Sequence, residues 1–138
     1  MPFDLERFVE AQEGRYEGAL RELRAGRKTG HWIWFIFPQV AGLGRSEMSQ
    51  RYGIESAGEA CAYLDHPVLG PRLRECVRAV LGTSANTAEQ IFGSLDAKKV
   101  KSSMTLFHRA APDDPLFTEM LERWYGGVAD PATEALLG

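Results

Sequence analysis

Apolar residues recur at helical spacing along almost the whole chain, and this periodicity constrains the fold more than any other feature. Over residues 4–25 they fall three or four positions apart, as on a helix whose one face lies against a core. No segment shows a convincing alternation of apolar and polar residues, the pattern that is typical of a half-buried strand. The sequence therefore predicts an all-α fold, a compact single-domain bundle of helices.

Capping residues, glycines and prolines divide the pattern into about eight short and medium helices. Asp4 and Asp96 are among the expected caps. Six consecutive apolar residues, 32–37, fit a buried strand or a fully buried helix, and the helical neighbours favour a helix. The expected segments are 4–25, 30–38, 46–52, 56–64, a helix that has Pro67 and Pro71 in its first turns and ends at Gly82, a short helix capped by Asn86 or Thr87, 96–110, 115–125 and a terminal turn over 130–137.

Length and charge exclude several classes of protein. The 138 residues suit one domain, residues 1–138, and 16 Lys and Arg against 19 Asp and Glu give a net charge of −3. A general nucleic-acid coat protein needs a basic face, so nucleic acid is an unfavoured partner. The longest apolar run has six residues, against the roughly 20 needed to span a bilayer. Cys61 and Cys76, without a secretory signal, indicate reduced thiols and a cytoplasmic domain with no membrane contact.

Metal and phosphate motifs are incomplete in this sequence. The histidines, at 31, 66 and 108, lack the spacings that are typical of metal ligands, so we expect no metal and no cofactor. The segment 42–46 (GLGRS) leads into a predicted helix, and its glycines, arginine and helix amides could hold an anion. It lacks the full dinucleotide and triphosphate fingerprints, and a tight turn before a capped helix explains it as well.

Two clusters carry the densest chemistry. Residues 27–39 combine cations, an imidazole, two indoles and an amide, which suits a planar ligand with an anionic tail. Residues 96–108 place three lysines near a helix start, where the helix dipole favours acids instead. The alternatives are aromatic residues that fill the core and a charged face in contact with water. Asp65 and His66, in a break between helices, form a third candidate as an acid–base pair.

Four ordered blocks carry a family resemblance: residues 28–39 (KTGHWIWFIFPQ), 42–46 (GLGRS), 63–73 (YLDHPVLGPRL) and 99–107 (KVKSSMTLF). They resemble the DUF1810 family, whose members are called Rv1873-like and are sometimes labelled "calpastatin". The resemblance implies a compact, mostly helical fold and no established catalytic residue. The family's polar positions correspond here to Lys28, His31, Trp32, Gln39, Arg45, Ser46, Asp65, His66, Lys99, Ser102 and Thr105.

The leading hypothesis is a polar-aromatic pocket, built from both clusters, for a small anionic ligand such as a nucleotide or an ADP-ribose-like molecule. Trp32 would stack on a ring, and phosphate would be neutralised by cations. Whether the domain is an enzyme stays open; a hydrolysis would use His31 or the Asp65–His66 pair to move the proton. The expected ligand-binding residues are Lys28, Trp32, Gln39, Arg45, Ser46, Lys99, Ser102 and Thr105.

A different class of function is a protein-interaction module. Residues 110–138 contain one arginine against six acids, a local charge of −5, which could attract a basic partner. Nucleic-acid binding through Arg21, Arg24, Arg27 and Lys28 is the least favoured hypothesis.

Overall fold

A computed structural model describes residues 3–138 of the chain. Across these residues the structure contains nine helices and no strand, and this confirms the all-α prediction. The helices are α1 (Glu6–Gln12), α2 (Tyr16–Arg24), α3 (Ile33–Ile36), α4 (Glu47–Arg51), α5 (Ala57–Asp65), α6 (Leu69–Leu81), α7 (Ala88–Ala110), α8 (Pro115–Tyr125) and α9 (Pro131–Leu137). None of the helices described is long and apolar enough to cross a membrane.

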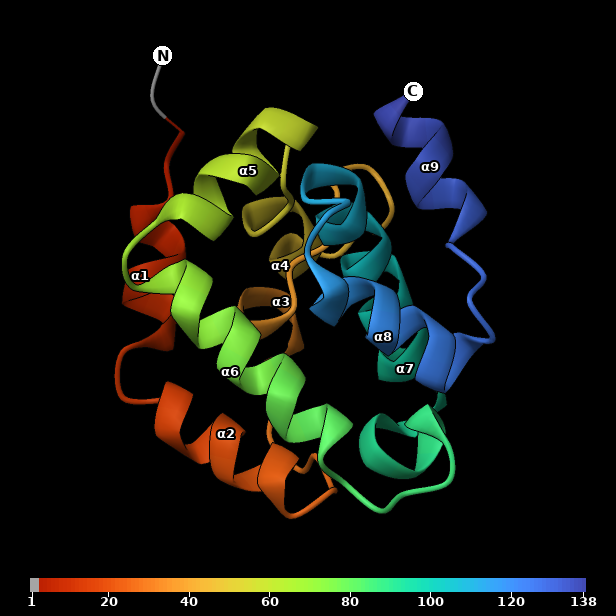
Figure 1. The fold of residues 1–138 in the computed structure, drawn as a ribbon. Coiled ribbons are helices and arrows are strands. Elements are labelled where there is room, and N and C mark those ends of the chain that lie inside the picture. Colours follow the sequence, from red (N-terminus) through yellow and green to blue (C-terminus); the bar gives the residue numbers. More distant parts are fainter. Residues whose placement is uncertain (1–2) are drawn as a thin grey trace.

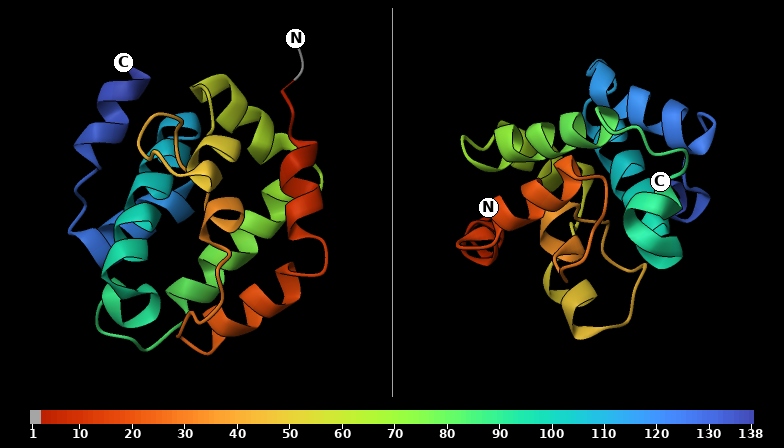
Figure 2. Two further views of the ribbon diagram at one scale, coloured as in Figure 1. Left: turned by 180° about the vertical axis from the view of Figure 1, so that it is seen from behind. Right: turned by 90° about the horizontal axis from the view of Figure 1, so that it is seen from below.

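The short helix α3 lies near the middle of the molecule, with the longer helices packed around it (Figures 1 and 2). It contacts α1 on one side and α7 on the other. Ile33, Phe35 and Ile36 are almost completely buried, so the apolar run is the centre of the core, and the prediction of a buried helix is confirmed. Helix α7 packs against α5, α8 and α9, and α2 packs against α6.

Local capping signals place most helix starts where the sequence predicts them. Ser46 accepts a hydrogen bond from Ser49 N at α4, and Ser56 accepts one from Glu59 N at α5. Asp114 and Asp130 cap α8 and α9, each with proline in the first turn. These helices begin within one or two residues of the predicted positions because a cap depends only on residues close in sequence.

Two predicted boundaries are wrong. The single helix expected over residues 4–25 is two helices, α1 and α2, because the chain turns at Gly14, whose φ of 72° suits glycine. Asp96 caps no helix: Thr87 caps a longer α7, which continues through an interruption at Gly93 (φ 80°, ψ 165°). The short helix after Thr87 and the helix over 96–110 are thus the two parts of α7.

Helix α4 sits inside a loop that a pair of backbone hydrogen bonds closes. Ala41 N donates to Ile54 O at 2.7 Å, and Ile54 N donates to Gln39 O at 2.9 Å. The segment after α3 therefore returns to its own starting point, and Met48 and Ser49 of α4 line one hollow with Trp34 of α3. This closure builds the hollow described below.

Candidate functional site

The two predicted clusters meet in space, and Asp96 joins them. Lys28 Nζ lies 2.7 Å from one oxygen of the Asp96 carboxylate, and Lys99 Nζ lies 3.4 Å from the other. The Lys28 side chain is only 8% exposed, and its ammonium also donates to Gly30 O at 2.6 Å. Two ammonium groups share one carboxylate, so the cluster keeps one net positive charge, and Lys99, at 27% exposure, is the cation that reaches solvent.

The loop that carries Lys28 is held by the carboxylate of Glu22 on α2. One oxygen of Glu22 accepts hydrogen bonds from Thr29 N (2.7 Å), Gly30 N (2.9 Å) and Trp32 Nε1 (3.0 Å). Burial raises the pKa of this carboxyl, but the hydrogen bonds from Gly30, Thr29 and Trp32 outweigh burial and lower the pKa to about 2.

We expect Glu22→Gln to lower the free energy of unfolding by about 1–2 kcal/mol near pH 7, since an amide accepts these three donors less well and the site is partly exposed to water. The pKa of Glu22 is lowered in the folded state, so its contribution is complete above the unfolded value of 4.5 and is lost as the pH falls through about 2. Urea unfolding at several pH values should therefore show the two proteins converging in acid. The exposed Glu17→Gln on the same helix is the control. A constant difference at every pH would contradict this role.

Trp32 has no free ring face for a ligand. Its side chain is 5% exposed, its Nε1–H is donated to Glu22, and Lys28 Nζ lies 5.0 Å from the ring centroid. The Phe37 ring packs against it at 6.3 Å between centroids. The structure thus gives Trp32 a place in the core, as the alternative interpretation of the aromatic residues expects.

Trp34, two residues on, is the indole that borders open space. It lines a small hollow between the end of α3 and helix α4, together with Gln39, Val40, Leu43, Gly44, Met48, Ser49 and Tyr52. The part of this hollow open to the centre of a water molecule is about 10 Å³, which is room for about one water. Lys99 Nζ lies 5.1 Å from the Trp34 ring centroid, so a cation lies next to this lining residue of the hollow.

Two polar groups of the hollow lack partners within residues 3–138. Trp34 Nε1 is buried and donates no hydrogen bond. The Gln39 side-chain amide, half-buried, makes no hydrogen bond to another described residue. Buried donors in native proteins are almost always paired, so an unpaired indole N–H on a residue that lines a hollow requires an explanation.

The GLGRS segment forms a turn. Ser46 Oγ accepts from Ser49 N at 3.1 Å and donates to Ser49 Oγ at 2.9 Å, so its hydroxyl is used. A Cβ on Gly44 would lie 2.5 Å from Ser49 Oγ, which explains glycine there. Arg45 is exposed, and α4 is only five residues long. The arrangement agrees with the tight-turn alternative, and the turn supplies the rim of the hollow.

Ser102 and Thr105 face α9 and not the hollow. Ser102 Oγ lies 2.7 Å from Thr133 Oγ1. Thr105 Oγ1 donates to Lys101 O at 2.8 Å and accepts from Asp130 N at 2.9 Å. Both hydroxyls are buried and bonded, so they fasten the C-terminal helix to α7.

The predicted catalytic residues do not line the hollow. His31 and Asp65 are exposed. His66 Nδ1 accepts hydrogen bonds from Val68 N at 3.1 Å and Leu69 N at 3.2 Å, and this is a cap at the start of α6. The sequence predicted that His66 lies in a break between helices. In the structure its imidazole caps the start of α6.

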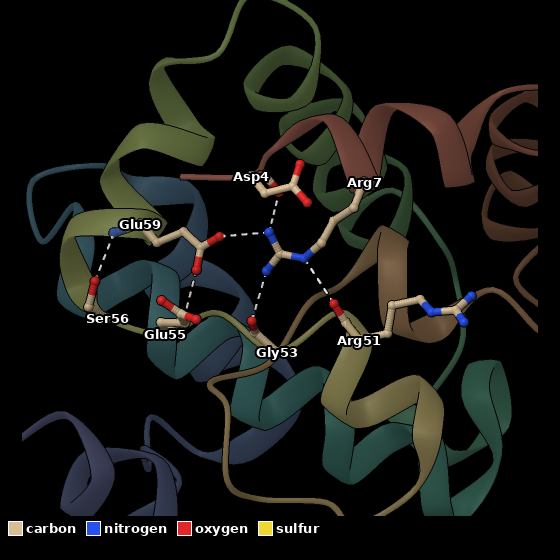
Figure 3. Close-up of polar contacts among 7 residues, drawn as sticks. All are labelled: Asp4, Arg7, Arg51, Gly53, Glu55, Ser56 and Glu59. Atoms are coloured by element: carbon tan, nitrogen blue, oxygen red, sulfur yellow. Dashed lines mark hydrogen bonds and ion pairs between the residues drawn. The ribbon is translucent and has the colours of Figure 1, made fainter. Parts of the chain in front are cut away.

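Sequence reasoning missed an ion pair between the buried Glu59 and the partly buried Arg7. Arg7 Nη1 lies 2.9 Å from Glu59 Oε2, and the guanidinium also donates to the carbonyls of Arg51 and Gly53, at 2.9 Å each, and to that of Asp4 (Figure 3). Glu55 N donates to the other Glu59 oxygen at 2.8 Å. Through these carbonyls the Arg7–Glu59 pair holds the chain directly after α4 in place. In the sequence, only the Ser56–Glu59 capping spacing pointed to Glu59.

Half of the acids in the C-terminal region have partners within the fold. Asp114 pairs with Arg74 at 3.0 Å, Glu134 pairs with Arg109 at 2.8 Å, and Asp130 caps α9. Asp113, Glu119 and Glu122 are exposed. A basic protein partner for this region stays a prediction. In the described part of the chain, His, Cys, Asp and Glu form no group of three that could hold a metal ion.

The sequence and the structure of this chain were compared with those of known proteins. The chain matches the family model described as "Protein of unknown function (DUF1810)" over residues 2–137. The chain belongs to the DUF1810 family. A solved structure similar to this DUF1810 domain is that of the conserved hypothetical protein Rv1873 from Mycobacterium tuberculosis, with 52% sequence identity and a TM-score of 0.97. The match covers 99% of this chain and 98% of the Rv1873 chain. A search of curated proteins found no match.

Proposed function

We propose that this DUF1810 domain binds a small planar molecule with an anionic group, and that the edge of its ring enters the hollow beside Trp34. The observation that carries the proposal is that Trp34 lines this hollow and that its buried Nε1–H has no acceptor among the described residues. Lys99, beside the same ring, supplies the positive charge.

The energetic argument starts from the orphaned donor. Leaving a buried N–H without an acceptor costs about 1–3 kcal/mol. A ligand that presents a carbonyl oxygen or a ring nitrogen removes this cost, whereas an apolar ligand does not. The hollow has room for about one water-sized group, so a single polar atom at the edge of a ligand ring fits there.

The chemistry of the rim narrows the class of ligand. The Gln39 amide offers one acceptor and two donor hydrogens, which suits the edge of a nucleobase. The Lys99 ammonium suits a phosphate, and the single carboxylate of Asp96 does not neutralise both lysines. A nucleoside monophosphate combines these features. Because only a ring edge fits the hollow, the sugar and the phosphate lie over the rim.

The geometry supports binding rather than hydrolysis. Of the residues predicted to move a proton, His31, Asp65 and His66, none lines the hollow, and a general acid or base must lie within one hydrogen bond of the reacting atom.

Calorimetric titration with AMP, UMP and their nucleosides tests the proposal. We expect Trp34→Phe to weaken nucleotide binding about 5- to 30-fold, because it removes one hydrogen bond worth about 1–2 kcal/mol and keeps a ring of similar shape. Trp124→Phe is the matched control: Trp124 Nε1 is also buried without a partner, but Trp124 does not line the hollow.

The phosphate contact has a separate readout. We expect AMP to bind the wild-type protein more tightly than adenosine, and Lys99→Gln to remove that difference. Equal losses in the Trp34 and Trp124 variants, or nucleotide binding that is absent at millimolar concentration, would contradict the proposal.

A further inference from the structure

Helices α2 and α6 lie side by side (Figure 1), and an open groove of about 560 Å³ runs beside their contact. Its charged lining residues are three arginines and one acid: Arg24, Arg72, Arg78 and Glu75. The local charge is therefore +2, in a chain whose net charge is −3. The hollow at Trp34 shares no lining residue with this groove.

Arg72 is held in place without a carboxylate partner. Its Nη1 donates to Gln12 Oε1 at 3.2 Å, and its guanidinium carbon lies 4.8 Å from the Tyr16 ring centroid. Gln12 is 2% exposed and is itself fixed, since its amide donates to Phe35 O at 2.8 Å and to Tyr63 Oη at 3.2 Å. The guanidinium is thus oriented before any ligand arrives, and this lowers the entropic cost of binding an anion.

The acid in the groove does not neutralise the arginines. Glu75 accepts a hydrogen bond from Tyr16 Oη, and its contact with Arg24 is loose, at 3.5 Å between side chains that are 63% and 46% exposed. Arg78 forms no ion pair with a described residue. Most of the guanidinium donors therefore face water.

Helix dipoles explain only part of this arrangement. Arg24 and Arg78 lie in the last turns of α2 and α6, where cations are favoured. Arg72 is the fourth residue of α6, close to the end where the dipole favours acids. The helix dipole therefore accounts for the positions of Arg24 and Arg78 but not for that of Arg72, which Gln12 and Tyr16 hold instead.

We propose that this groove binds the diphosphate group of a small molecule. Guanidinium groups bind phosphate oxygens in pairs of parallel hydrogen bonds, and two or three of them match two adjacent phosphates in charge and in number of donors. Beyond Arg72 a second hollow continues, where Glu13 and Glu17 accompany Arg15. These acids repel an anion, so the diphosphate lies in the first groove, where Arg72, Arg24 and Arg78 all line the wall.

The probe is inorganic diphosphate, titrated by calorimetry at low ionic strength. We expect Arg72→Gln and Arg78→Gln each to weaken binding tenfold or more. Arg27→Gln, which removes the same charge from an exposed position outside the groove, should stay within twofold of the wild type. If Arg72→Gln unfolds because it loses its contact with Gln12, the exposed Arg78→Gln still decides the result.

Equal weakening in all three variants would show a general charge effect and would overturn the proposal, as would the absence of diphosphate binding. Preferential binding of a single-stranded oligonucleotide, with the same dependence on Arg72 and Arg78 but no diphosphate affinity, would overturn it in favour of a nucleic-acid surface. These outcomes are independent of AMP binding at Trp34, since the two tests use different variants and different probes.

Discussion

Replacing Glu59 with alanine is expected to lower the free energy of unfolding by about 3 kcal/mol, because it leaves the partly buried Arg7 guanidinium without its counter-charge. Glu59 is 1% exposed, and the Arg7 side chain is 18% exposed. The variant also removes the acceptor for Glu55 N. Urea unfolding followed by circular dichroism measures the loss.

Two further variants separate this explanation from a general effect of mutation. Glu47→Ala breaks an exposed pair with Arg51, whose side chains are 85% and 56% exposed, and should cost less than about 1 kcal/mol. The double variant Arg7→Met with Glu59→Leu should cost less than Glu59→Ala alone, because neither charge is left unpaired. A double variant that is less stable than the single one would show that the unpaired charge is not the cause.

Replacing Gly70 with alanine is expected to destabilise the protein by about 2–3 kcal/mol or more. A Cβ at this position would lie 2.1 Å from the carbonyl oxygen of Leu64 and 2.9 Å from its carbonyl carbon. Backbone atoms cannot turn away as a side chain can, so helices α5 and α6 must move apart. The loss is measured by the same urea unfolding.

Gly18 provides the control for Gly70. It also lies inside a helix, but a Cβ there would meet no atom within 4 Å. Gly18→Ala should therefore stabilise the protein by about 0.5–1 kcal/mol, the ordinary helix preference of alanine over glycine. If both alanine variants were stabilising, the close approach at Gly70 would not be a constraint on the fold.

The helices could be predicted where the signals were local. The hydroxyls of Ser46 and Ser56 cap α4 and α5 as expected, because a cap and its amide lie three residues apart. Asp96 carried an equally good capping signal, but its carboxylate is taken by Lys28, 68 positions earlier in the sequence. A contact at that separation leaves no pattern in a single sequence.

The candidate site shows the same division. The sequence indicated that residues 28–39 and the lysine-rich part of α7 carry the chemistry, and the structure brings Lys28 and Lys99 onto one carboxylate. The sequence could not indicate which of the two indoles is covered. Trp32 is covered, and its N–H donates to Glu22 on another helix. Ser102 was predicted as a ligand contact, but the return of α9 to α7 provides Thr133 as its partner.

The indole N–H signals of the three tryptophans test the central claim most directly, since each gives its own peak in a two-dimensional ¹H–¹⁵N NMR spectrum. Trp34→Phe and Trp124→Phe assign the peaks. On addition of AMP we expect the Trp34 signal to shift downfield as its N–H gains an acceptor, while the Trp32 signal, bonded to Glu22, and the Trp124 signal stay in place. A Trp34 signal that does not move at millimolar AMP, or three signals that move together, would contradict a ligand site at this hollow.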